Sequence, residues 1–190
     1  GTIISPHLST PINNTTILIE NGLITAIHPS SDPVSKEYQQ INAANQWILP
    51  GLIDSHVHLF QSASIFTRPD SLDLTAIQPY QDDRNWVNNH LSDTFTRYLQ
   101  SGVTSILDMG GPNWNFSVKQ MANHQLFAPR MNTAGPLIGP ISMPKLDIEG
   151  TIFEKASTAE EAVESVKQQL KFKPDIIKIV WTPELGHTTE

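Results

Sequence analysis

The chain has 190 residues, 38% of them hydrophobic, which is enough to supply the core of one ordinary domain or of part of a larger one. A formal net charge of −7 and 12 scattered Lys and Arg residues argue against nucleic acid as a partner, because no basic stripe could neutralise a phosphate backbone. The lack of cysteine excludes disulfides, thiolate nucleophiles and Cys-based zinc sites, and every apolar run is far shorter than the roughly 20 residues of a membrane helix.

The first 50 residues are predicted to form short β-strands. We expect strands at residues 2–4, 16–20, 23–27 and 46–49. Asn21 and Gly22 separate two alternating apolar runs, and an Asn-Gly pair in that position indicates a tight hairpin. Residues 1–50 are therefore expected to be a small all-β segment.

From residue 51 onward the pattern changes to strands that alternate with helices, which is typical of parallel βαβ units. The predicted strands are residues 51–59, 103–108, 130–134 and 175–180, and the predicted helices between them cover 86–99, 118–126 and 160–172. Gly102 is expected to stop the first of these helices, and the spacing of Thr158 and Glu161 is that of a capping box at the start of the last. The predicted fold class is therefore α/β.

Four strand-helix units occupy residues 51–190, which is about 140 residues, whereas a closed (βα)8 TIM-type barrel takes about 250. We therefore expect 51–190 to be the first half of such a barrel, with 1–50 as part of a preceding β-sandwich domain. Either the other half lies on another chain, or the sequence is a fragment. A half barrel would leave an unpaired strand edge, which favours association.

His56 and His58 are the first candidates for chemistry. They stand at the end of the predicted strand 51–59, where residues two apart point to the same face. Two imidazoles on one face are half of a zinc-type site, and the carboxyl ends of barrel strands carry active sites. A His-x-His triplet also occurs by chance in a chain with seven histidines.

The residues around this pair favour the functional interpretation. Residues 49–58, LPGLIDSHVH, closely resemble the first-strand motif of the amidohydrolase superfamily, with its Pro-Gly, two hydrophobic residues, Asp and His-x-His. Residues 101–111, SGVTSILDMGG, resemble the second strand and its loop, and residues 128–136 resemble the third. The resemblance is strongest to imidazolonepropionase-like and prolidase-like members, and it implies that this chain is the N-terminal portion of such a hydrolase.

Lys178 lies in the segment 175–179, DIIKI, which resembles the fourth strand whose lysine is carboxylated and bridges two metals. Burial between two Ile residues would disfavour a bare ammonium and lower the pKa of the amine, which helps it to react with carbon dioxide. The alternative is a lysine that extends its charged end to solvent from a strand end. The resemblance favours the bridging role.

Other polar residues carry weaker signals. Asp54 is a candidate to orient a metal ligand, although an Asp near a strand end is as often a turn residue. Asp108 is expected near the mouth of the site. Trp181 either lines a pocket or packs under a loop, and His187 has no motif behind it. The remaining histidines, at positions 7, 28, 90 and 124, are expected on the surface or on helix faces.

The resemblance implies hydrolysis of an amide, lactam or peptide-like C–N bond by a hydroxide that bridges two divalent metal ions, with zinc the first choice. His56, His58 and Lys178 would be the metal ligands. The family's remaining ligands and its catalytic Asp would lie beyond Glu190, so no catalytic residue is assigned in this chain and the 190 residues alone are expected to be inactive. The substrate is expected to be a small molecule or dipeptide-like compound.

Two alternatives remain from the residues alone. One is a mononuclear, deaminase-like amidohydrolase, which uses the His-x-His strand without a bridging lysine. The other is a non-catalytic relative that keeps the fold for binding or assembly. The expected protein partner is a second copy or the remainder of the same hydrolase, and neither nucleic acid nor a membrane is expected. The cytoplasm is the favoured compartment, with export left open because no leader can be read.

Overall fold

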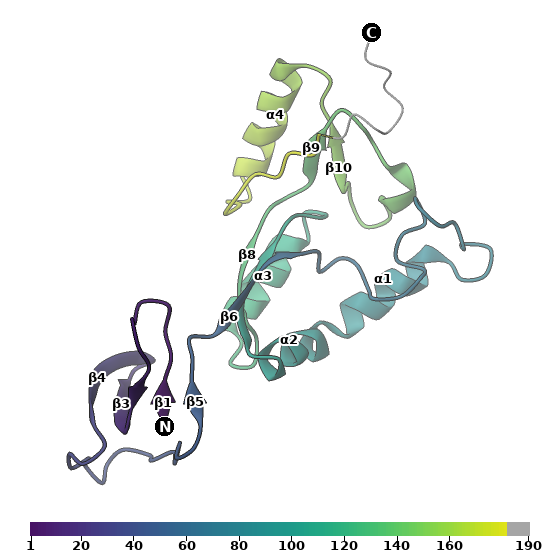
Figure 1. Ribbon diagram of the computed structural model, residues 1–190. Coiled ribbons are helices and arrows are strands. Elements are labelled where there is room, and N and C mark those ends of the chain that lie inside the picture. The colour runs from purple at the N-terminus through teal and green to yellow at the C-terminus, as the bar shows by residue number, and fades with distance from the viewer. Residues whose placement is uncertain (182–190) are drawn as a thin grey trace. The chain divides into compact units, whose positions relative to one another are not determined.

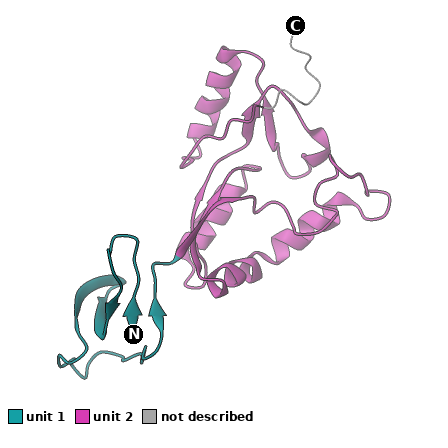
Figure 2. Ribbon diagram, viewed as in Figure 1, with its two compact units in different colours: residues 1–51 teal, residues 52–190 magenta. Residues whose placement is uncertain are grey.

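The structure, a computed structural model, describes residues 1–181. It divides into two compact units, Gly1–Gly51 and Leu52–Glu190, which Figure 2 shows in different colours. No helix in the described part of the chain is long and apolar enough to cross a membrane.

The first unit consists of two small sheets. One has three two-residue strands, in the order β2 (Ile12–Asn13), β1 (Thr2–Ile3) and β5 (Trp47–Ile48). The other is an antiparallel hairpin of β3 (Thr15–Glu20) and β4 (Leu23–Pro29). Asn21 and Gly22 form its turn with φ values of 51° and 77°, the left-handed conformation that these two residue types adopt most easily. The predicted hairpin is confirmed.

The second unit is built on a sheet of three parallel strands in chain order: β6 (Leu52–Val57), β7 (Val103–Asp108) and β8 (Arg130–Thr133). Both neighbouring pairs are parallel, as the alternation of strands and helices predicts. Strand β7 has the predicted bounds. Strand β6 is shorter than the predicted 51–59 and ends at Val57, so His58 already belongs to the loop that follows.

Among the described residues, four α-helices connect and flank these strands: α1 (Tyr80–Asn89), α2 (Leu91–Gln100), α3 (Asn115–His124) and α4 (Ala159–Leu170). A short 3-10 helix, η1, covers Pro144–Leu146. Helix α2 packs against β7 and α3 against β8 (Figure 1). The prediction of one helix over 86–99 is wrong, because the helix is broken at His90, whose φ of −118° lies outside the helical range. Thr158 does cap α4, accepting a hydrogen bond from the amide of Glu161 at 3.2 Å.

Two apolar clusters hold the second unit together. The first lies between the sheet and helices α2 and α3, and its buried members are Val57, Leu59, Phe95, Ile106, Val118, Ala122 and Met131. The second gathers Phe60, Tyr80, Leu137, Leu146 and Ile152. Leu59 and Phe60 are consecutive, yet they belong to different clusters. The chain directly after His58 is therefore held by both.

The predicted fourth strand, residues 175–180, is wrong as a regular strand. It forms a single parallel bridge, between Ile179 and Ile138. The amide of Asp175 still reaches the carbonyl of Thr133 at 3.0 Å, and Ile138 exchanges hydrogen bonds with Lys178 and Val180. The segment thus runs beside the continuation of β8, but Pro136 in that continuation has no N–H to donate, so the ladder is interrupted.

A short parallel pair, β9 (Leu137–Gly139) and β10 (Phe153–Lys155), is not predicted by the sequence. Strand β9 lies between β10 and the bridge at Ile179. Strands of three residues carry too few alternations to be recognised from a pattern.

Candidate metal centre

The candidate centre lies at the carboxyl ends of β6 and β7. His56 is the penultimate residue of β6, and His58 directly follows the end of that strand. Asp108 is the last residue of β7. Parallel strands bring their carboxyl ends to one edge of the sheet, which is where α/β proteins bind ligands. The spacing in the sequence therefore places these three residues on one edge.

The ring of His58 is fixed by the backbone of the neighbouring loop. Its Nδ1 lies 2.8 Å from the carbonyl oxygen of Gly110, so Nδ1–H donates and the lone pair is left on Nε2. Burial lowers the pKa of His58, against an opposing effect of the Gly110 hydrogen bond. A neutral imidazole with a defined tautomer is the form that a divalent cation requires.

His56 is exposed and lies beside His58. The two rings are edge-to-face, with centroids 5.4 Å apart and an interplanar angle of 67°. Asp54 accepts a hydrogen bond from the backbone amide of His56, between Oδ1 and N at 3.2 Å, so its contact is with the main chain of the candidate ligand and not with the ring. The strand spacing thus brings two imidazoles together on one face.

Asp108 is fully buried, and its carboxylate receives three N–H donors. These are the amides of Gly110 at 3.0 Å and Leu59 at 3.3 Å and the side-chain amide of Asn115 at 3.0 Å. Burial raises the pKa of Asp108 to about 7, although the two backbone amides act to lower it. Asn115 had no signal in the sequence, because its partner Asp108 lies on another element.

Lys178 is half-buried on the segment that bridges to β9. Its positive charge is one of the influences that lower the pKa of His58, which places the lysine within electrostatic range of that ring. The same is true of Arg68, on the loop between β6 and α1. Trp181 has 78% of its surface exposed, and His187 lies outside the described residues.

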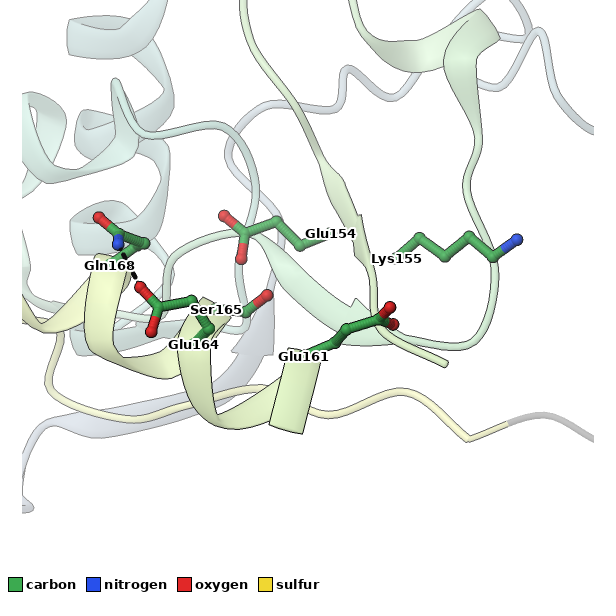
Figure 3. A pocket seen from close by; sticks show the side chains of 6 residues that line it. All are labelled: Glu154, Lys155, Glu161, Glu164, Ser165 and Gln168. Carbon is green, nitrogen blue, oxygen red and sulfur yellow. Dashed lines mark hydrogen bonds between the residues drawn. The ribbon is translucent and has the colours of Figure 1, made fainter. Parts of the chain in front are cut away.

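The residues that the structure describes contain no group of three or more His, Asp or Glu side chains close enough to hold a metal ion. Two imidazoles provide half of a four-coordinate site. A separate open pocket lies between β10 and α4 (Figure 3). It is lined by Glu154, Lys155, Glu161, Glu164, Ser165 and Gln168, and it includes none of the predicted site residues.

The pattern of the amidohydrolase family matches residues 47–184. The imidazolonepropionase of Pseudoalteromonas atlantica is 48% identical over 46 residues, which is 24% of this chain and 11% of that protein. The enamidase of Eubacterium barkeri is 26% identical over 172 residues, covering 88% of this chain and 38% of the enamidase.

Among solved structures, a prolidase in complex with N-methylphosphonate-L-proline superimposes with a TM-score of 0.72 at 19% identity. The match covers 94% of this chain and 44% of the prolidase, so the chain spans less than half of the length of these relatives. At that identity the likeness shows the fold alone. The family pattern covers most of the chain, and the chain belongs to the amidohydrolase family.

Proposed function

We propose that the full-length protein hydrolyses an amide, lactam or peptide-like C–N bond with the help of two divalent metal ions, zinc the first choice. The observation that carries this proposal is the pair of imidazoles at the carboxyl end of β6, with the His58 ring held by the Gly110 carbonyl so that Nε2 can bind a cation. When bound, such cations lower the pKa of water and polarise the substrate carbonyl.

Within this proposal His56 and His58 hold one metal ion, and a carboxylated Lys178 bridges both. The half-buried position of Lys178 and its electrostatic influence on His58 support this role. Residues 51–190 supply the first half of a (βα)8 barrel, which is supported by three parallel strands that pair in chain order. Residues 1–50 supply part of a small β-sandwich domain.

The relatives' names guide the choice of substrates. Two relatives are named imidazolonepropionase and enamidase, and the prolidase structure holds N-methylphosphonate-L-proline. The first set of test substrates should therefore contain cyclic amides, lactams and Xaa-Pro dipeptides.

The test is metal content and hydrolysis of that set of substrates by the full-length protein and three variants. His56→Ala and His58→Ala should each lower the bound zinc and nearly abolish turnover. Lys178→Ala should lose bridging and activity, and added short carboxylic acids should restore part of the activity by occupying the place of the carbamate. His124→Ala, on an exposed part of α3, is the matched control and should leave both quantities unchanged.

Two outcomes would overturn the proposal. Full metal content and activity in Lys178→Ala without added acid would refute the bridge and favour a mononuclear, deaminase-like enzyme. Unchanged zinc content in both His variants would refute the metal site altogether and favour a binding or assembly role.

A further inference from the structure

We propose that Asp108 is a positioning residue that fixes His58 through two separate routes, one to the backbone beside His58 and one to the carbonyl that holds its ring. This inference rests on the metal site proposed above. It assigns to a buried side chain on β7 the task of setting both the place and the tautomer of the candidate ligand that directly follows β6.

The first route fixes the backbone on both sides of His58. Met109 donates its amide to the carbonyl of Val57 at 2.9 Å, and Leu59 donates its amide to Oδ2 of Asp108 at 3.3 Å. The residues before and after His58 are thus tied to consecutive residues of the neighbouring strand end. The Cα of His58 has little freedom to move along the edge of the sheet.

The second route fixes the ring. Oδ1 of Asp108 accepts the amide of Gly110 at 3.0 Å, which closes a short turn after β7. That turn directs the Gly110 carbonyl oxygen to Nδ1 of His58 at 2.8 Å. Gly110 has a φ of 109°, so the direction of its carbonyl depends on a conformation that other residues rarely adopt. If the turn opened, His58 would lose the acceptor that selects its tautomer.

The groups around the Asp108 side chain favour a carboxylate over an amide at this position. All three of its recorded partners are N–H donors, and the third is Nδ2 of Asn115, a fully buried residue at the start of α3. A carboxylate can accept from all of them, whereas an Asn would turn an NH2 group toward at least one donor. Asp108→Asn therefore keeps the shape of the side chain and removes one route or the other.

The experiment compares the affinity of the full-length protein for Zn²⁺, measured by chelator competition, with that of Asp108→Asn. The expected loss is about 10- to 100-fold, the usual effect of removing a partner of a metal-binding His. Asp83→Asn is the matched control. Asp83 is also buried, at 2% exposure, and accepts from the hydroxyls of Ser62 and Ser64, without a recorded link to His58 or Gly110. The affinity of Asp83→Asn for Zn²⁺ should stay within about twofold of that of the wild type.

A second readout reports the ring directly. In the metal-free protein labelled with ¹⁵N-histidine, His58 should show protonated Nδ1 in the wild type and in Asp83→Asn. In Asp108→Asn it should show a mixture of tautomers. If Asp108→Asn does not fold, Asn115→Ala removes one donor to the carboxylate and should weaken zinc binding by a few-fold, with the Asp83 variant again as the control.

The inference is overturned if Asp108→Asn, or Asn115→Ala in its place, binds zinc as the wild type does and keeps the wild-type tautomer. It is also overturned if Asp83→Asn loses as much affinity, because the effect would then follow general destabilisation. If zinc content does not fall in His58→Ala, the proposed metal site fails first. The two failures can therefore be told apart.

Discussion

Gly110 stands at a position where a side chain has no room. Its φ is 109°, and a Cβ built there would lie 2.5 Å from the carbonyl oxygen of Gly135. We expect Gly110→Ala to lower the free energy of unfolding by about 3 kcal/mol or more, since the left-handed backbone alone costs 1–2 kcal/mol and the clash with a backbone oxygen adds to it.

Gly102 provides the comparison within the same unit. It also has a positive φ, 80°, but a Cβ there would meet only the far end of Leu52, at 4.0 Å. Gly102→Ala should therefore cost about 1 kcal/mol, from the backbone conformation alone. Urea unfolding of both variants measures the difference, and equal losses would show that the Gly135 contact does not matter.

Asp108 should make the stability of the metal-free protein depend on pH. Burial raises the pKa of this carboxyl to about 7, well above its ordinary value of 3.8. Between these two values the folded protein holds the proton more often than the unfolded chain does. The contribution of Asp108 to the free energy of unfolding is therefore largest below about pH 4 and falls as pH rises to about 7, by on the order of 4 kcal/mol.

The measurement is urea unfolding of the wild type and Asp108→Asn at several pH values. The variant lacks the titrating group, so the difference in stability between the two proteins should shift in favour of the variant as pH rises. A difference that stays constant from pH 4 to pH 8 would contradict the expected shift.

At the same scale, the sequence predicts some contacts of the candidate site and not others. The alternation of side chains along a strand predicts that His56 and His58 share a face, and their rings lie edge-to-face. Their role as metal ligands stays a prediction. The contact of His58 with the Gly110 carbonyl could not be predicted, because it depends on the direction of a loop peptide. The side chain of Asp108 holds this loop, and so does the hydrogen bond from the Gly111 amide to the carbonyl of the distant Gly135, at 3.3 Å.

At the scale of elements, Arg84 joins segments that are distant in the sequence. The side chain is 1% exposed, and its guanidinium lies over the rings of Phe60 and Trp114, 5.6 Å and 5.0 Å from their centroids. Its Nη2 also pairs with Oε2 of Glu149 at 3.4 Å. We expect Arg84→Ala to lower the free energy of unfolding by about 3 kcal/mol, because it removes two cation–π contacts and the partner of a carboxylate.

Lys145 gives the control for this prediction. Its Nζ also forms an ion pair with a carboxylate that is distant in the sequence, Oδ2 of Asp73 at 2.8 Å, but both side chains are exposed. Exposed ion pairs contribute little to stability. Lys145→Ala should therefore leave the melting temperature nearly unchanged, and a similar loss in both variants would indicate that charge, and not packing on the aromatic rings, is what matters.

The helices and strands that the sequence predicts well are those with a local cause. Asn21-Gly22 sets a turn by its own backbone preferences, and Thr158 caps α4 within its first turn. The break at His90 is different, because α1 directs Arg84 and Val87 inward while α2 buries Phe95, and one apolar period runs across both. The sequence pattern therefore gives no sign of the break, which lies in the backbone conformation of His90, with a φ of −118°.

The fourth predicted strand depends on a distant part of the chain. Residues 175–180 have the apolar composition of a strand, and they do lie beside the continuation of β8. Regular pairing fails because the partner segment contains Pro136, a feature of another part of the chain. A strand pattern predicts the tendency to extend, whereas the ladder depends on the donors that its neighbour offers.

The second unit leaves several large apolar side chains exposed. Ile53 on the edge strand β6 is 71% exposed, and Ile179 and Trp181 are 65% and 78% exposed. An edge strand with unpaired backbone groups and apolar side chains promotes association. We therefore expect the 190-residue chain, expressed by itself, to associate.

Light scattering after gel filtration, over a range of concentrations, measures this. The apparent mass of the isolated chain should rise with concentration, and the double substitution Ile53→Lys and Ile179→Lys should reduce the rise. A concentration-independent monomer with a cooperative thermal transition would contradict the expectation.

The order of the strands in the main sheet bears on how the protein forms during synthesis. Because β6, β7 and β8 are neighbours in both the chain and the sheet, each new strand finds its partner already made when it leaves the ribosome. Each crossover connects strands that are near in the sequence, through residues 58–102 between β6 and β7 and residues 109–129 between β7 and β8, which keeps the loop-closure entropy of each step moderate. The sheet can therefore grow by addition at one edge while translation continues.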